Sequence, residues 1–87
     1  MKTRTPPKDV LTAIGKLCDA WCERKCLTAL RYLLPSWPLI NTLTDGWADL
    51  SVALQNVRAF AGHEITLVEV QKVEDLIRDV DRIVQRA

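Results

Sequence analysis

The second half of the chain carries two runs of apolar residues whose spacing alternates between three and four positions. The first run consists of Trp47, Leu50, Leu54, Val57 and Ala61, and the second of Val70, Val73, Ile77, Val80 and Val84. Because an α-helix makes one turn about every 3.6 residues, each run forms an apolar stripe along a helix. Two such stripes joined by a short linker predict a helical hairpin in which the stripes pack against each other.

Polar residues beside these runs mark where the two helices begin and end. Thr44 is placed to cap the N-terminus of the first helix, and Gly62 is expected to end it in a left-handed conformation. Thr66 and Glu69 have the spacing of a capping box, in which each side chain accepts a hydrogen bond from the other residue's backbone N–H group. These signals predict helices over residues 45–61 and 66–86.

The first half of the chain has two apolar stripes that do not line up. One consists of Val10, Ile14, Leu17 and Trp21, and the other of Leu27, Leu30 and Leu34. On one straight helix the two stripes would lie more than a third of a turn apart. Either the helix breaks near residues 23–25 and both halves face one core, or it is continuous and the halves bury against different partners. Because positions 22–26 contain neither proline nor glycine, we predict a continuous helix over residues 8–34, stopped by Pro35.

The expected architecture is an all-α, three-helix bundle in which a long N-terminal helix is followed by an α-hairpin. The second-half stripe of the long helix would complete the core, which leaves the first-half stripe uncovered. A second copy of the chain would cover it, because two-fold dimers are the commonest oligomers. Residues 1–7 are expected to form a flexible basic arm, and residues 8–87 a single helical domain. We therefore predict a homodimer whose interface contains Val10, Ile14, Leu17 and Trp21.

Composition and charge are those of a soluble globular protein. The chain has 87 residues, of which 48% are hydrophobic and 26% charged, and its formal net charge is +1. This balance argues against disorder and provides no overall electrostatic field that would recruit nucleic acid. No uncharged apolar run is long enough to cross a membrane or to serve as a secretory signal. Three cysteines, an odd number, favour a reduced cytoplasm over a disulfide framework.

The cysteines Cys18, Cys22 and Cys26 recur at every fourth position of the N-terminal helix. Thiolates bind soft metals and His63 is a conceivable further ligand, so a thiol-based metal or redox sensor is one alternative function. However, one helix presents two such ligands to an ion far more readily than three, and a free cysteine behaves as a small buried hydrophobe. We therefore predict that the cysteines pack in the seam between the two stripes, and we predict no metal and no cofactor.

Trp37 stands between Pro35 and Pro38, in a loop that also contains Leu39 and Ile40. A rigid aromatic loop would suit the hot spot of a protein interface. Three large apolar residues rarely stay exposed together, however. We expect these residues to fold back over the open end of the hairpin, with a partner contact through Trp37 as the alternative.

Basic residues are the remaining candidates for a binding site. The last helix carries a row of arginines interleaved with acids, namely Arg78, Arg82 and Arg86 with Glu74, Asp75, Asp79 and Asp81. Such a face is expected to neutralise itself. The arm with Lys2, Arg4 and Lys8 is the better candidate for nucleic acid, which gives a small DNA-binding regulator as the second alternative.

No arrangement of residues in the sequence predicts catalysis. A nucleophilic site needs a base and an orienting group, and the chain has one histidine, no glycine-rich phosphate loop and no acidic metal cluster. The apolar surface exceeds what three short helices bury, which favours a surface for another protein. We therefore expect a non-enzymatic protein–protein interaction module, such as an adaptor, a regulator or an immunity-type inhibitor.

Overall fold

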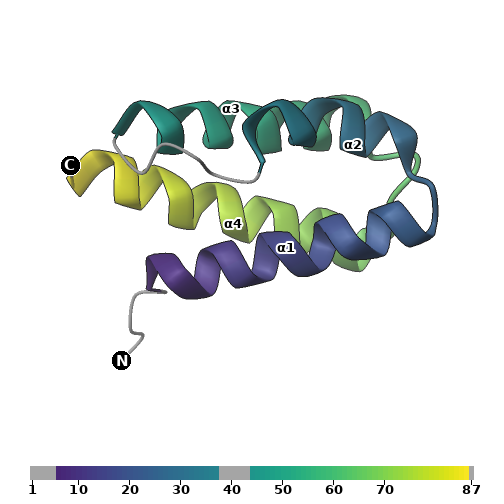
Figure 1. The fold of residues 1–87 in the computed structure, drawn as a ribbon, viewed down its shortest axis with the longest axis horizontal. Helices are drawn as coiled ribbons and strands as arrows, with labels where there is room; N and C mark the ends of the chain where they lie inside the picture. The colour runs from purple at the N-terminus through teal and green to yellow at the C-terminus, as the bar shows by residue number, and fades with distance from the viewer. Residues whose placement is uncertain (1–5, 38–43, 87) are drawn as a thin grey trace.

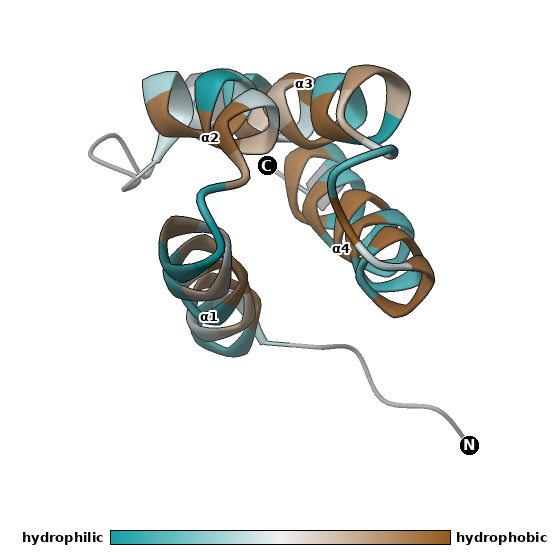
Figure 2. Ribbon diagram, turned by 90° about the vertical axis from the view of Figure 1, so that its right-hand side faces the viewer, coloured by the Kyte–Doolittle hydropathy of each residue, from teal (hydrophilic) through white to brown (hydrophobic). Residues whose placement is uncertain are grey.

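The computed structural model describes residues 6–37 and 44–86, with the backbone alone at Thr44, Asp45 and Arg86. Within these ranges the chain forms the helices α1 (Pro7–Glu23), α2 (Leu27–Leu33), α3 (Thr44–Phe60) and α4 (Leu67–Arg86), with a short 3₁₀ helix η1 (Leu34–Ser36) after α2. The predicted all-α class is therefore confirmed. The helices lie in two layers, with α2 and α3 above α1 and α4 (Figures 1 and 2). None of the described helices combines the length and the apolar character that a membrane span requires.

The helices α3 and α4 pack as the predicted hairpin. The five residues of the first stripe are all buried, namely Trp47, Leu50, Leu54, Val57 and Ala61. On α4, Val73, Ile77 and Val80 are buried, while Val70 and Val84 are half-buried at the edge of the core. These two helices share the most extensive contact between any two elements of the described chain, so the hairpin forms the centre of the fold.

Thr66 and Glu69 form the predicted capping box at the start of α4. The Glu69 backbone N–H group donates to Thr66 Oγ1 and the Thr66 N–H group donates to Glu69 Oε1, both over 3.0 Å. The predicted left-handed cap at Gly62 is wrong, because no described glycine has a positive φ. The helix α3 ends instead at Phe60, and its predicted cap by the Thr44 side chain lies outside the described side chains.

The predicted continuous N-terminal helix is wrong, because the chain turns between α1 and α2. Lys25 has a φ of 57°, in the left-handed region. The Lys25 N–H group donates to the Cys22 carbonyl over 3.3 Å, and the Cys26 N–H group donates to the Trp21 carbonyl over 2.8 Å. This pair of bonds is the Schellman motif that ends many helices. Neither glycine nor proline marks this turn in the sequence, because a lysine takes the left-handed position.

The turn allows both halves of the N-terminal segment to face one core, which is the arrangement set aside in favour of a continuous helix. The first-half stripe, Val10, Ile14, Leu17 and Trp21, is 0%, 0%, 6% and 0% exposed within a single chain. From the second half, Leu30 is buried together with Ala29 and Leu33, whereas Leu27 and Leu34 are 68% and 46% exposed. The described bundle therefore has four α-helices instead of three. The face assigned to a second copy belongs to the chain's own core.

Candidate functional site

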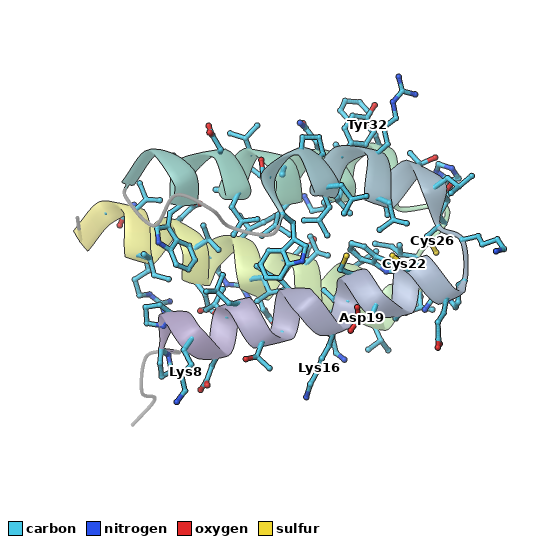
Figure 3. All side chains as sticks on the ribbon, viewed as in Figure 1. Lys8, Lys16, Asp19, Cys22, Cys26 and Tyr32 are labelled. Atoms are coloured by element: carbon cyan, nitrogen blue, oxygen red, sulfur yellow. The ribbon has the colours of Figure 1, made fainter. Side chains whose placement is uncertain are left out.

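Cys22 and Cys26 lie towards the end of the molecule where α1 turns into α2 (Figure 3), and Cys18 precedes Cys22 by four positions on α1. Cys18 and Cys26 are buried and Cys22 is exposed, and all three are free thiols. Burial raises the pKa of the Cys18 thiol, and the adjacent Cys22 raises it further. Within residues 6–37 and 44–86, no three His, Cys, Asp or Glu side chains are grouped as metal ligands would be. The arrangement places two thiols in the core and leaves Cys22 accessible to solvent.

Trp37 folds back onto the bundle and is half-buried against its core. A Cβ atom at Gly15 would lie 3.5 Å from Cζ2 of the Trp37 ring, so the indole covers α1 at a position without a side chain. Leu39 and Ile40, expected to fold back with it, lie outside the described residues. His63 is exposed in the turn between α3 and α4.

The arginine row on α4 is neutralised locally, as expected. Arg78 forms an ion pair with Asp75, and Arg82 Nη1 lies 3.4 Å from Asp79 Oδ1. Lys8 is exposed at the start of α1 (Figure 3). The side chain of Arg86 and the arm residues Lys2 and Arg4 lie outside the described part of the chain.

Two carboxylates, one in the α3–α4 turn and one at the start of α4, bind the α1–α2 turn and the start of α2. Glu69 accepts two hydrogen bonds from Arg24, of 2.6 and 2.8 Å, and these bonds lower its pKa to about 2. Glu64 Oε1 accepts the backbone N–H groups of Thr28, at 2.8 Å, and Ala29, at 3.1 Å. Hydrogen bonding with Thr28 holds the pKa of Glu64 below its usual range. Because the residue before α2 provides no side-chain cap, Glu64 caps this helix from a distant turn.

A groove of about 360 Å³ runs between α1 and α4. It is lined by Ala13, Lys16, Leu17 and Ala20 from α1, and by Glu69, Lys72, Asp75 and Leu76 from α4. Leu17 and Leu76 are each 6% exposed and form an apolar floor, while the two half-buried alanines leave space above it. The view along the bundle shows both of these helices, α1 and α4, below the α2–α3 layer (Figure 2).

Charged side chains border this apolar floor. Glu69 is bound by Arg24 and Asp75 by Arg78, so both acids already have a cationic partner. Lys16 and Lys72 are exposed. Lys16 projects from the side of α1 that is turned away from α2 (Figure 3). An apolar floor with polar edges is the arrangement expected of a binding groove for an amphipathic partner.

This groove was not predicted from the sequence, because its residues come from two helices that are far apart in the chain. On α4, Lys72 and Leu76 lie beside the core stripe rather than in it. On α1, Ala13 and Ala20 are small residues seven positions apart, next to the stripe that contains Leu17. Small residues at heptad spacing beside a stripe were the available signal. These small residues indicate a groove only once it is known that α1 packs antiparallel to α4.

A second, shallower hollow of about 290 Å³ lies between α2 and α3 on the outer surface. Tyr32 projects from this surface (Figure 3), and its ring centroid lies 5.3 Å from that of Phe60. Phe60 and Val52 are 56% and 55% exposed. These residues form a second apolar patch. The hollow beside it is also lined by the exposed charged residues Arg31 and Asp49, which form no ion pair within residues 6–37 and 44–86.

No protein-family model, no curated protein and no solved structure matches this chain. The groove between α1 and α4 and the side chains that line it are therefore the features from which a function is inferred.

Proposed function

We propose that the chain is a small, non-enzymatic protein-interaction module that binds an amphipathic helix of a partner protein in the α1–α4 groove. The observation that carries this proposal is the make-up of the groove. Leu17 and Leu76 offer an apolar floor, Ala13 and Ala20 leave room for incoming side chains, and lysines stand at the edges. Recognition of a helix in a groove relies on these features, with anchors from the partner at helical spacing.

The shape of the groove also supports a helical occupant. Its walls are two antiparallel helices (Figure 1), and the side-chain ridges of a third helix can pack into the furrow between two such helices. The apolar stripe of α1 that was predicted to form a dimer interface is buried in the chain's own core. We therefore assign partner binding to the α1–α4 groove. A second copy of the chain remains one of the partners that an experiment would detect.

The chemistry of the groove supports binding rather than catalysis. Of the described residues that line it, none is a serine, cysteine or histidine. Its two carboxylates, Glu69 and Asp75, are held by Arg24 and Arg78 and are not positioned as a free acid–base pair. Nucleophilic catalysis needs a nucleophile together with a base that activates it.

The test is an affinity capture from the lysate of the native host with three versions of the protein as bait. In Ala20→Arg, a long charged side chain fills the groove. In the matched control Ala59→Arg, the same change is made on the exposed side of α3. Circular dichroism establishes that both variants keep the helical content of the unchanged protein. Each capture is repeated at low and at high salt.

We expect one stoichiometric protein to be retained by the unchanged bait and by Ala59→Arg, and to be lost with Ala20→Arg. Retention should persist at high salt, because apolar burial supplies most of the affinity. Recovery of nucleic acid alone, released by salt, would favour the DNA-binding alternative and overturn the proposal. Equal retention by Ala20→Arg would also overturn it, because the partner would then bind elsewhere.

A further inference from the structure

The charges at the edges of the α1–α4 groove restrict which amphipathic helices can bind in it. This inference rests on the function proposed above. Four of the lining residues are charged. Glu69 and Asp75 are satisfied by arginines of the same chain. Lys16 and Lys72 form no ion pair within residues 6–37 and 44–86. The charge that the groove offers to an occupant is therefore positive.

The two lysines stand on opposite walls of the groove. Because α1 and α4 run in opposite directions (Figure 1), Ala13 meets the Leu76 end of the groove and Ala20 meets the Glu69 end. Lys16 and Lys72 consequently lie near the middle of its length, one on each helix. Each lysine has a long apolar stem that borders the floor and an ammonium group that remains in solvent.

We propose that the α1–α4 groove selects an amphipathic helix that carries acidic residues on both flanks of its apolar stripe. A helix that places apolar side chains on Leu17 and Leu76 brings the flanks of its stripe next to Lys16 and Lys72. In paired helices the flanking positions e and g carry the charges that decide which partner is accepted. Glutamates there form ion pairs with the lysines, whereas lysines there place like charges together and are rejected.

The magnitude of this selection follows from the exposure of both lysines. An exposed ion pair changes affinity by a factor of about two to five, because solvent screens it. Changing two attractive pairs into two repulsive ones therefore alters affinity by about tenfold at low salt, and by less at high salt. Burial of the partner's apolar stripe therefore supplies most of the affinity, and the charges on its flanks determine which helices bind more tightly.

The experiment is a display selection with a library of helical peptides about three heptads long, with apolar residues at a and d. Positions e and g carry an equal mixture of glutamate, lysine and glutamine. The library is selected on the unchanged protein, on the double variant Lys16→Glu, Lys72→Glu, on Ala20→Arg, and on the control Arg31→Glu. Arg31 is exposed on α2 and lines the hollow between α2 and α3, so the control also reports binding at that surface. The affinities of the enriched peptides are then measured by fluorescence anisotropy.

We expect glutamate to be enriched at e and g on the unchanged protein and on Arg31→Glu. On the double variant, lysine should be enriched instead, and the glutamate peptide should bind it about tenfold more weakly than it binds the unchanged protein. Enrichment of apolar peptides with no preference at e and g would overturn the charge selection while leaving the groove as the binding site. Enrichment that persists on Ala20→Arg, or none on the unchanged protein, would overturn the proposed function and the selection together.

Discussion

Lys25 has the backbone conformation that glycine usually provides at the end of a helix. A left-handed conformation costs a residue with a side chain about 1–2 kcal/mol. The turn persists because hydrogen bonds on both sides hold it, and because Arg24, the residue before it, is bound to Glu69. The strain is therefore confined to one exposed residue, where a substitution can release it.

Lys25→Gly should raise the free energy of unfolding by up to about 1 kcal/mol, since the relief of strain exceeds the added flexibility of the unfolded chain. Lys25→Val should lower it by more than about 1 kcal/mol, because a β-branched residue tolerates this conformation worst. Urea unfolding of both variants measures these changes. If α1 and α2 formed one continuous helix, Lys25→Gly would instead lower the free energy of unfolding by about 1 kcal/mol, because glycine is unfavourable inside a helix.

Glu69 makes stability depend on pH through its bonds to Arg24. Its pKa falls from 4.5 to about 2 on folding, so the contribution is present above pH 4.5 and is lost as the pH falls towards 2. The difference corresponds to about 3 kcal/mol, but the Arg24 side chain is 42% exposed and solvent screens part of it. We expect about 2 kcal/mol to be lost over this range. Thermal unfolding of Glu69→Gln should show a flatter pH dependence between pH 5 and 2, and an unchanged slope would contradict this assignment.

At the scale of elements, α2 is the shortest of the four described α-helices and depends on contacts with a distant part of the chain. It has seven residues and its N-terminal N–H groups are capped by Glu64 from the α3–α4 turn. A helix of this length is not stable in isolation. Unfolding of α2 would therefore indicate that the α1–α2 turn and the α3–α4 turn have separated.

Glu64→Ala should destabilise the protein by about 1–2 kcal/mol, because the N–H groups of Thr28 and Ala29 lose their acceptor. Glu64→Gln should cost less, since an amide oxygen still accepts these bonds. Amide hydrogen exchange, followed by NMR, should show protection at residues 28–30 lost in the alanine variant and the amides of α3 unchanged. Equal loss in both helices would indicate global destabilisation and would contradict a local role.

The elements that were predicted correctly are those whose signals are local. The stripe from Trp47 to Ala61 and the capping box at Thr66 and Glu69 are each contained in a few turns of the chain, and the structure confirms both. The break between α1 and α2 was missed because its supports are not local. Its left-handed residue is a lysine, and the cap of the following helix is Glu64, which lies 36 positions after Thr28. The groove was missed for the same reason, since its two walls come from opposite ends of the sequence.

At the scale of the whole molecule, Trp21 is an internal residue rather than the anchor of a dimer. It is 0% exposed within one chain. Its indole nitrogen lies near Glu69 and influences the pKa of that carboxyl, but it makes no hydrogen bond of normal geometry within the described residues. The side chain therefore acts mainly through its volume, at the junction of α1 with α4.

Trp21→Ala should lower the free energy of unfolding by about 3–5 kcal/mol through the cavity that it leaves. Trp21→Phe should cost less, because it keeps most of the volume and loses no hydrogen bond. The midpoint of thermal unfolding of the unchanged protein should be the same at two concentrations differing tenfold, since Trp21 is buried without a second copy. A midpoint that rises with concentration, and ceases to do so in Trp21→Ala, would restore the dimer interface at this residue.

The dependence of α2 on Glu64 has a consequence for synthesis of the chain on the ribosome. Residues emerge in order, and a nascent chain that has emerged only as far as Phe60 has no acceptor for Thr28 and Ala29 and no partner for Arg24. The contacts that hold the α1–α2 turn and the start of α2 therefore form only after the α3–α4 turn and the first turn of α4 have left the exit tunnel. A later segment of the chain therefore supplies the cap of α2 and the partner of Arg24, so these contacts of the earlier segment form only after the later one has been synthesised.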